Sequence, residues 1–133
     1  MAQEVHVEVK QISATTSSCA ARHHQMLSDR PEAKGGTDRG PMGGEMLLMG
    51  LGGCFMSNLL AAVRARDAAV SNIAINVTGT LAETPVRFSD IKMAISGTYD
   101  DRADLEKLVT IAERSCIVAN TLKHAVRLSF EVV

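Results

Sequence analysis

Alternating and continuous apolar segments along the chain predict an ordered series of strands and helices. Valines alternate with polar residues from Val5 to Val9, which predicts a first strand with one buried face. One or two further strands are expected in residues 12–28, and a glycine-rich loop is expected in residues 34–44. From about Glu45 to Arg66 the residues are nearly all apolar or glycine, which predicts a long central helix that is hydrophobic on every side.

The pattern alternates again in the second half of the chain. Residues 73–77 and residues 86–95 are each predicted to form a strand, and residues 80–85 are predicted to turn the chain between them. The apolar positions of the second strand shift by one residue, which predicts a bulge near Ser89 and Asp90.

Two helices and a final strand are predicted after this hairpin. Asp100 or Asp101 is expected to cap the first helix, and Ser115 is expected to cap a shorter one that ends near Lys123. Alternation in residues 126–132 predicts the last strand.

This order of elements predicts one α+β domain that spans residues 1–133. Strands and helices do not alternate one by one, so a doubly wound parallel sheet is disfavoured. A single small sheet covers only one side of a helix that is apolar all round. We therefore expect the other side to pack against a second copy of the chain in a homodimer.

Composition excludes several classes of function. The net charge is −1, only 3% of residues are aromatic and there is no Trp, so neither nucleic acid nor an anionic membrane is an expected partner. Residues 46–63 are uncharged and reach the lower limit of a membrane span, but their glycines, Ser57 and Asn58 favour a core helix. Three widely spaced cysteines and a charged first segment favour the cytoplasm, where thiols stay reduced.

Two of the three cysteines are candidates for chemistry. Cys54 lies within the apolar helix, directly after two glycines that allow a partner helix or a substrate to approach the backbone. Cys116 follows the expected cap at Ser115, where free N–H groups and the helix dipole favour a thiolate. The alternative for each is a buried cysteine that acts only as a small apolar side chain.

The third cysteine, Cys19, lies near His23 and His24 in a polar segment. Their spacing is not that of a usual zinc site, and the chain contains no Cys-x-x-Cys motif. We therefore expect no metal ion and no other resident cofactor.

Charged residues bracket the glycine-rich loop. Arg22 and Arg39 precede and occupy it, and Glu45 closes it. An arginine near Cys54 would stabilise the thiolate and bind a peroxide oxygen, and a carboxylate would orient the guanidinium. The alternative is that all three are solvated surface charges.

The segment RHHQMLSDRPEAKGGTDRGPMGGEMLLMGLGGC, followed about sixty residues later by SCIVANTL, resembles the superfamily of OsmC and organic hydroperoxide resistance (Ohr) proteins. Its YhfA-like branch is the nearest in appearance. That branch shares the Arg-His start, an Asp-x-Pro, a Gly-Gly, a Gly-Pro and an acidic-Leu-Leu segment before the first cysteine. The matching positions in this chain are Arg22, His23, Asp29, Pro31, Gly35, Gly36, Gly40, Pro41, Glu45, Leu47, Leu48 and Cys54.

The resemblance implies an intertwined, domain-swapped homodimer with antiparallel strands around the long helix. It also implies a thiol peroxidase that protects against oxidative stress by reducing organic hydroperoxides. Cys54 would become a sulfenic acid, Cys116 would resolve it to a disulfide, and an external dithiol such as a lipoyl-type dithiol would reduce that disulfide. Arg22 would activate the thiolate.

The resemblance gives Glu45 the role of orienting Arg22, but the family's carboxylate stands ten residues before the first cysteine. In this chain that position is Gly44. Because one residue rotates a helix position by about 100°, Glu45 is alternatively a helix-start residue. The proline that often follows the second cysteine is Ile117 here.

Two other functions stay open on the sequence. One is a thiol redox sensor without turnover. The other is a binding protein for a small apolar ligand in a cleft between subunits, with thiols that only pack. That cleft would be lined by Met42, Met46, Met49 and Phe55, and the same methionines would favour organic peroxides over hydrogen peroxide.

Overall fold

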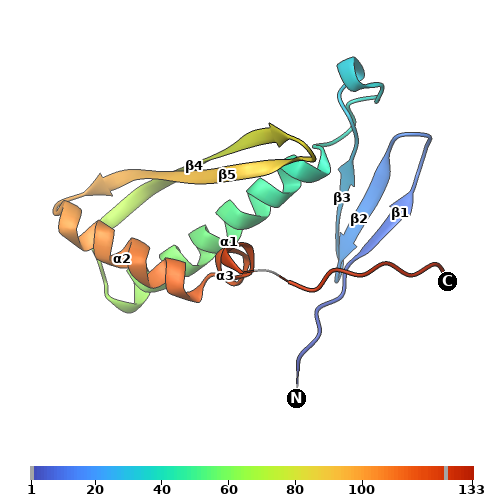
Figure 1. Ribbon diagram of the computed structural model, residues 1–133. Helices are drawn as coiled ribbons and strands as arrows, with labels where there is room; N and C mark the ends of the chain where they lie inside the picture. Colours follow the sequence, from blue (N-terminus) through green and yellow to red (C-terminus); the bar gives the residue numbers. More distant parts are fainter. Residues whose placement is uncertain (1, 125) are drawn as a thin grey trace. The chain divides into compact units, whose positions relative to one another are not determined.

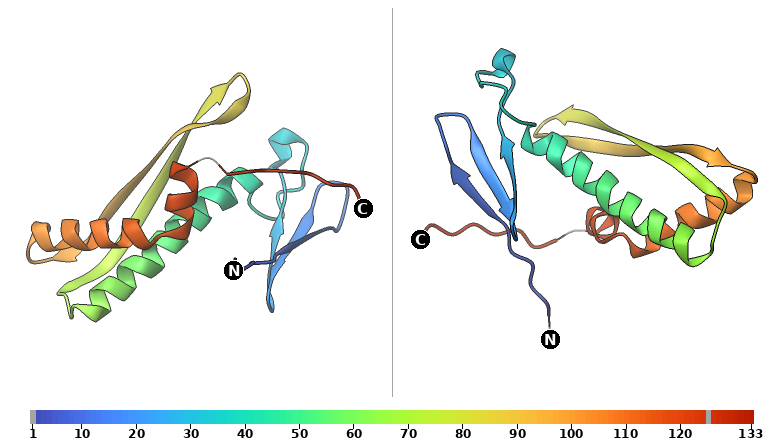
Figure 2. Two further views of the ribbon diagram at one scale, coloured as in Figure 1. Left: turned by 60° about the horizontal axis from the view of Figure 1, so that its bottom comes forward. Right: turned by 180° about the vertical axis from the view of Figure 1, so that it is seen from behind.

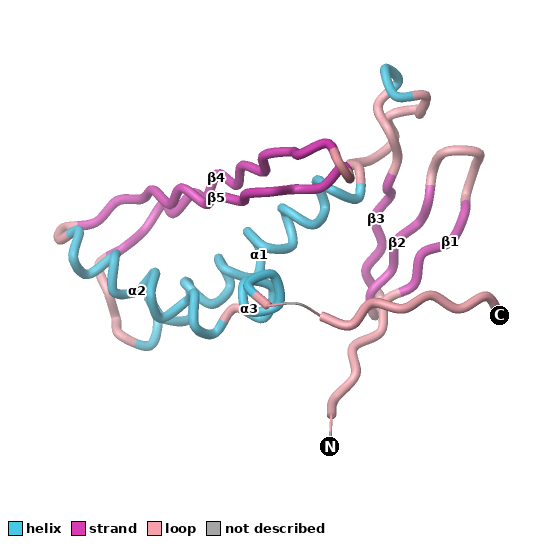
Figure 3. The backbone as a smooth tube through the Cα atoms, in the orientation of Figure 1, coloured by secondary structure: helices cyan, strands magenta, loops and turns pink. Residues whose placement is uncertain are grey.

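The computed structural model describes residues 2–124 and 126–133 (Figure 1). The elements follow the order β1–β2–β3–η1–α1–β4–β5–α2–α3, and all paired strands are antiparallel (Figure 3). This arrangement confirms the predicted α+β class. The chain divides into two compact units, Met1–Leu47 and Leu48–Val133.

The first unit contains a three-stranded sheet, formed by β1 (Glu8–Gln11), β2 (Ser17–Ala21) and β3 (His24–Ser28) in that order. One or two strands were expected in residues 12–28, and two are present. The prediction of a buried face on the first strand is wrong, because every residue of β1 is exposed. Val5 and Val7, which precede the strand, are 92% and 69% exposed. Alternation alone does not bury a face; a second layer must cover it.

A buried carboxylate organises the loop that follows β3. Asp29 is only 3% exposed, and it accepts hydrogen bonds from the Thr37 hydroxyl and from the Thr16 hydroxyl, the latter at 2.8 Å. The backbone N–H groups of Arg30 and Arg39 also donate to it, at 2.7 and 3.2 Å. The hydrogen bond from Thr37 and the others hold the pKa of Asp29 well below its usual value of 3.8, although burial acts in the opposite direction.

The glycine-rich loop packs closely against neighbouring backbone. It follows a short 3-10 helix, η1 (Glu32–Lys34). A Cβ atom added at Gly36 would lie 2.0 Å from the Arg30 carbonyl oxygen, and one added at Gly40 would lie 2.1 Å from that of Leu27. Any side chain at these two positions would therefore displace the loop.

Helix α1 (Gly43–Ala65) begins at the end of the first unit and, in the second, continues into a long hairpin of β4 (Val70–Glu83) and β5 (Val86–Tyr99). The predicted central helix is confirmed. Its buried stripe is Leu51, Phe55, Leu59 and Ala62. The apolar face of the hairpin packs against the core that contains this stripe, through Ile73, Ile75, Val77, Ile91, Met93 and Ile95.

The expected bulge in β5 is confirmed. Thr80 pairs with Asp90 and Leu81 pairs with Phe88, so the register shifts around Ser89. The connecting turn is shorter than expected: β4 runs to Glu83, and only two residues lie between the strands.

Two helices complete the second unit and lie on the same side of the hairpin as α1 (Figure 2). α2 (Arg102–Ser115) begins at the predicted cap Asp101, whose side chain accepts a hydrogen bond from the Ala103 N–H at 3.0 Å. α3 (Ile117–Lys123) ends at the predicted residue.

The predicted final strand is absent from the described structure. Residues 126–133 have no regular secondary structure, and the apolar members of their alternating pattern are 64% to 101% exposed. The pattern is that of a strand, but the segment has no neighbouring strand to pair with in the described parts of the chain. A strand requires hydrogen bonds from a partner, which the pattern cannot supply.

α1 is long and apolar enough to cross a membrane, by length and composition alone. The core helix of a soluble protein meets the same test. One stripe of α1 packs in the core, while Met49 and Leu60 on other faces are 52% and 51% exposed. The helix thus has apolar surface that the described chain leaves uncovered.

The Asp29 network should contribute to the stability of the first unit. We expect Thr16→Val to lower the free energy of unfolding by about 2 kcal/mol, because it removes a buried donor to a carboxylate without changing the side-chain shape. Urea denaturation followed by circular dichroism measures the change. Thr15→Val, next to it in the chain, is the matched control and should have little effect.

The same network predicts the pH dependence of this difference. A carboxyl group whose folded-state pKa is depressed stabilises the fold above its unfolded-state pKa and loses that contribution as pH falls. The gap between the wild type and Thr16→Val should therefore be full at pH 7 and shrink below pH 3.8. A gap that widens under acid conditions would contradict the assignment.

Candidate thiol site

Cys54 and Cys116 are brought together in the core of the second unit. Cys54 lies in α1, is partly buried and packs against the buried cluster that contains Cys116. Cys116 lies at the junction of α2 and α3 and is 0% exposed. The two thiols are near enough for each to affect the pKa of the other. Two cysteines separated by sixty-one positions in the sequence therefore form one site.

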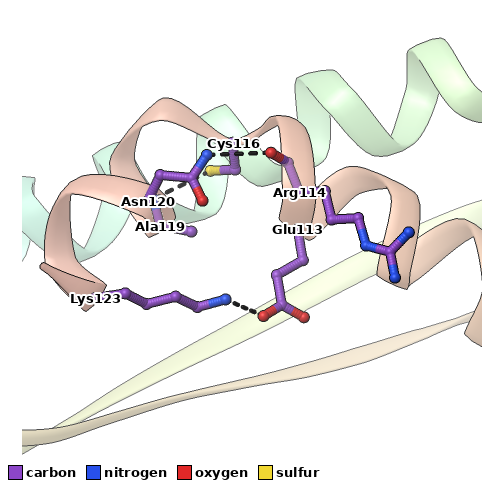
Figure 4. A network of polar contacts seen from close by, with 6 residues as sticks. All are labelled: Glu113, Arg114, Cys116, Ala119, Asn120 and Lys123. Atoms are coloured by element: carbon purple, nitrogen blue, oxygen red, sulfur yellow. Dashed lines mark hydrogen bonds and ion pairs between the residues drawn. The ribbon is translucent and has the colours of Figure 1, made fainter.

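Cys116 itself caps α3. Its Sγ accepts a hydrogen bond from the Ala119 N–H at 3.4 Å, and its own N–H donates to the Glu113 carbonyl at the end of α2 (Figure 4). The prediction that Ser115 caps this helix is wrong, because Ser115 is the last residue of α2. Serine is the more common capping residue, and here a sulfur one position later takes that place.

Polar contacts outside the core fix the junction around Cys116 (Figure 4). The Asn120 side chain donates to the Arg114 carbonyl at 3.1 Å, and Lys123 pairs with Glu113. Both contacts connect α3 with the last turn of α2. They hold the two helices on either side of Cys116 at a defined angle.

Hydrogen bonds favour the thiolate on Cys54. Burial raises the pKa of Cys54, but the Val118 N–H, the Cys116 thiol and the Ile117 N–H together outweigh it, so the pKa lies below the usual value. Burial also raises the pKa of Cys116. The Ala119 N–H opposes this effect, whereas the neighbouring Cys54 adds to it. Of the two thiols, Cys54 is thus the one whose pKa is lowered and Cys116 the one whose pKa is raised.

This order corrects one expectation from the sequence. The position of Cys116 at a helix start was expected to favour a thiolate on Cys116, whereas burial and the neighbouring Cys54 raise its pKa. In the structure the first N–H groups of α3 act on Cys54, so the start of the helix stabilises charge on its neighbour.

The remaining predicted site residues, Arg22 and Glu45, lie in the first unit. Arg22 was expected in a strand, but it lies in the turn between β2 and β3 with a φ of 57°. Glu45 accepts a hydrogen bond from the Met42 N–H at 2.8 Å in the first turn of α1. This contact is the reciprocal half of a capping box and identifies Glu45 as a helix-start residue. Their action on Cys54 stays a prediction.

Other sequence candidates lie apart from the thiol pair in the chain. Cys19 lies in β2 opposite Val9 and Met26. The rings of His23 and His24 lie 4.0 Å apart at the β2–β3 turn. Phe55, expected to line a ligand cleft, is instead a core residue that is 2% exposed.

Sequence reasoning did not assign a role to Asn58 or to Asp29. Asn58 lies one turn after Cys54, and its side-chain amide donates to the Cys54 carbonyl at 2.9 Å. The signal available was its four-residue spacing from the cysteine in an otherwise apolar helix. For Asp29, the available signal was the hydroxyl-rich sequence around it.

Comparison with known families assigns this fold to a class. Residues 36–131 match the model of the OsmC-like protein family. The match covers most of the chain, including both cysteines of the pair, and the protein belongs to that family. None of the curated proteins matches the sequence significantly.

Solved structures confirm the fold. An OsmC-like protein from Mycoplasma pneumoniae is 16% identical with a TM-score of 0.80, covering 92% of this chain and 89% of the other. An organic hydroperoxide resistance protein from Elizabethkingia anophelis is 10% identical, with a TM-score of 0.71 and coverage of 92% and 90%. The organic hydroperoxide resistance protein OhrB of Bacillus subtilis is 16% identical, with a TM-score of 0.63 and coverage of 91% of both chains.

The electrostatics of the pair predict the order of alkylation. In the reduced protein, Cys54 should react with iodoacetamide with an apparent pKa below 9.0, and Cys116 should react more slowly at every pH. Cys116→Ala should raise the Cys54 pKa because a donor is lost. Cys19→Ala is the control and should not change it. Mass spectrometry of alkylated peptides over a pH series measures both, and faster labelling of Cys116 would contradict the assignment.

Proposed function

We propose that this protein is a thiol peroxidase that reduces organic hydroperoxides in the cytoplasm. The observation that supports the proposal most directly is the pairing of a half-buried Cys54, whose pKa is lowered, with a buried Cys116, whose pKa is raised. Depressed pKa values at partly exposed cysteines are typical of reactive thiols. The family relationship to hydroperoxide resistance proteins agrees with this chemistry.

In the first step, the Cys54 thiolate attacks the outer oxygen of the hydroperoxide. The O–O bond breaks, Cys54 becomes a sulfenic acid, and the alkoxide leaves as an alcohol after taking up a proton. Sulfur is oxidised by two electrons and the peroxide is reduced by two. Cys54 can meet a peroxide because its side chain is not fully enclosed, and a Cβ built at Gly50, one turn earlier, would meet nothing within 4 Å in the described structure.

In the second step, Cys116 attacks the sulfenic sulfur of Cys54 as its thiolate. The S–O bond breaks, a disulfide forms, and hydroxide leaves as water after taking up the proton that Cys116 released. An external dithiol, such as a lipoyl-type dithiol, then reduces the disulfide and is itself oxidised. The negative charge on Cys54 is one cause of the raised pKa of Cys116, and the first step removes that charge. Cys116 therefore ionises more easily in the second step.

We propose that Arg22 binds the peroxide and stabilises the Cys54 thiolate. Glu45 would act on that arginine only if its carboxylate retained a free oxygen while it caps α1. Its observed Met42 contact uses Oε1, which leaves Oε2 for such a role. The guanidinium fork matches a carboxylate and a peroxide oxygen at the same time.

We further propose that the active form is an intertwined homodimer. Three apolar regions have no partner in the described chain. They are the uncovered surface of α1, the exposed valines before β1 and the unpaired residues 126–133. Exposed alternating segments are suited to pairing with a strand of another copy. In a two-fold symmetric dimer, each copy would cover these surfaces of the other through the same set of contacts.

Peroxide turnover tests the enzyme. With dihydrolipoamide as reductant, the wild type should consume cumene hydroperoxide more efficiently than hydrogen peroxide, because methionines near the start of α1 suit an organic tail. Cys54→Ser should lower the rate at least about 100-fold, and Cys19→Ser should leave it unchanged. Equal or better efficiency with hydrogen peroxide would remove the organic preference.

One equivalent of peroxide distinguishes the steps within this scheme. Peptide mass spectrometry should then find a Cys54–Cys116 disulfide within one chain, and Cys116→Ser should accumulate a sulfenic acid on Cys54. Disulfide formation without turnover would favour the redox sensor. A bridge to Cys19 would contradict the proposed pairing.

The dimer predicts a specific effect of the terminal segment. Sedimentation equilibrium should find a dimer at micromolar concentration, and Phe130→Ser should raise its dissociation constant at least about 100-fold, because a large apolar contact is lost. Glu131→Ser, the adjacent change, is the control. A folded monomer in the wild type would refute the dimer.

A further inference from the structure

We propose that Asn58 is the hydrogen-bond donor that positions the reacting sulfur of Cys54. Its amide nitrogen lies 2.9 Å from the Cys54 carbonyl oxygen and 3.9 Å from Cys54 Sγ. The inference rests on the proposed role of Cys54 as the peroxide-reactive thiol, and it adds a residue to that site.

The position of Asn58 on α1 accounts for this geometry. Residues four apart lie on the same face of a helix, one turn from each other. Asparagine is a poorer helix former than alanine or leucine, and its side chain competes for backbone hydrogen bonds. Here the half-buried Asn58 side chain uses this hydrogen-bonding capacity to donate to the carbonyl of Cys54.

The two N–H bonds of the amide have separate uses. One is satisfied by the Cys54 carbonyl and fixes the plane of the side chain. The other is available to the sulfur of the same residue. At 3.9 Å this second contact is long, so it is weak for a neutral thiol. A negative charge on sulfur strengthens it, because hydrogen bonds to charged groups are shorter and stronger than neutral ones.

Donors from two elements then enclose the thiolate. The groups that act on it from the α2–α3 junction are the Cys116 thiol and the N–H groups of Ile117 and Val118. Asn58 acts from α1 itself, one turn after Cys54. On the opposite side of Cys54 along the helix stands Gly50, which has no side chain to block a peroxide. Asn58 thus adds a donor to the sulfur from the C-terminal side of Cys54 on the same helix.

The test is the pH dependence of Cys54 alkylation in three variants of the reduced protein. Asn58→Leu replaces the amide by an apolar group of similar size, and Asn58→Asp replaces it by a charge of the same sign as the thiolate. The alkylation rate at pH 7 should fall roughly three- to tenfold in Asn58→Leu and further in Asn58→Asp, because the Cys54 pKa rises in that order. Ser57→Ala, an exposed change at the preceding residue, is the control and should keep the wild-type profile.

A merely structural asparagine gives a different result. Asn58→Leu removes a poor helix former, so a residue that only shapes the helix would leave the Cys54 pKa unchanged while thermal stability stays equal or rises. An unchanged pH profile in both Asn58 variants would overturn the proposal.

Peroxide turnover measured in parallel separates this proposal from the proposed function. A wild type that shows no turnover, but whose Cys54 pKa depends on Asn58, would refute the peroxidase and support the donor. Normal turnover in the wild type with no effect of Asn58→Leu on pKa would do the reverse.

Discussion

The contact between α1 and the α2–α3 junction is the interaction on which the chemistry of this protein depends. It brings a cysteine from the middle of one helix against the first residues of another, in a core made of buried leucine, phenylalanine and alanine side chains. The apolar surroundings raise the pKa of both thiols. The few N–H and S–H donors at that contact decide which thiol has the lower pKa. The pKa of Cys54 is therefore lowered, whereas that of its neighbour Cys116 is raised.

The helices and strands could be predicted from the sequence wherever the partner that an element packs against or pairs with lies in the same chain. The bulge at Ser89 was visible as a change of phase, and Asp101 as a polar residue before an apolar stripe. The long helix could be predicted because a segment of more than twenty nearly all apolar residues is too long for a typical strand. Prediction was wrong for residues 126–132 and for the first valines, because alternation indicates a strand but not what covers or pairs with it.

The candidate site could be predicted only in part. The two cysteines were found from their local context, but the helix start that was expected to favour a thiolate on Cys116 lowers the pKa of Cys54 instead. Hydrogen bonds across the junction decide that preference, and these depend on three-dimensional packing. The same limit applies to Glu45, whose sequence position allowed two roles until its contact with the Met42 N–H was seen. Ser115 was predicted to cap α3, but the sulfur of the next residue, Cys116, does so. Cysteine is a less common capping residue than serine, so the sequence favoured Ser115.

The capping of α3 by Cys116 couples the redox state of the site to the helix. In the reduced protein the sulfur accepts the Ala119 N–H, and the next N–H groups act on a neighbouring thiolate. In the proposed disulfide Cys54 could no longer carry a negative charge, so oxidation would weaken the contacts that the N–H groups of Ile117 and Val118 make with it. By thermodynamic linkage, the free energy that α3 loses on oxidation favours the dithiol form by the same amount. If the pair forms the proposed disulfide, the stability of a single helical turn would thus raise its reduction potential, and a dithiol that reduces the disulfide would recover that free energy.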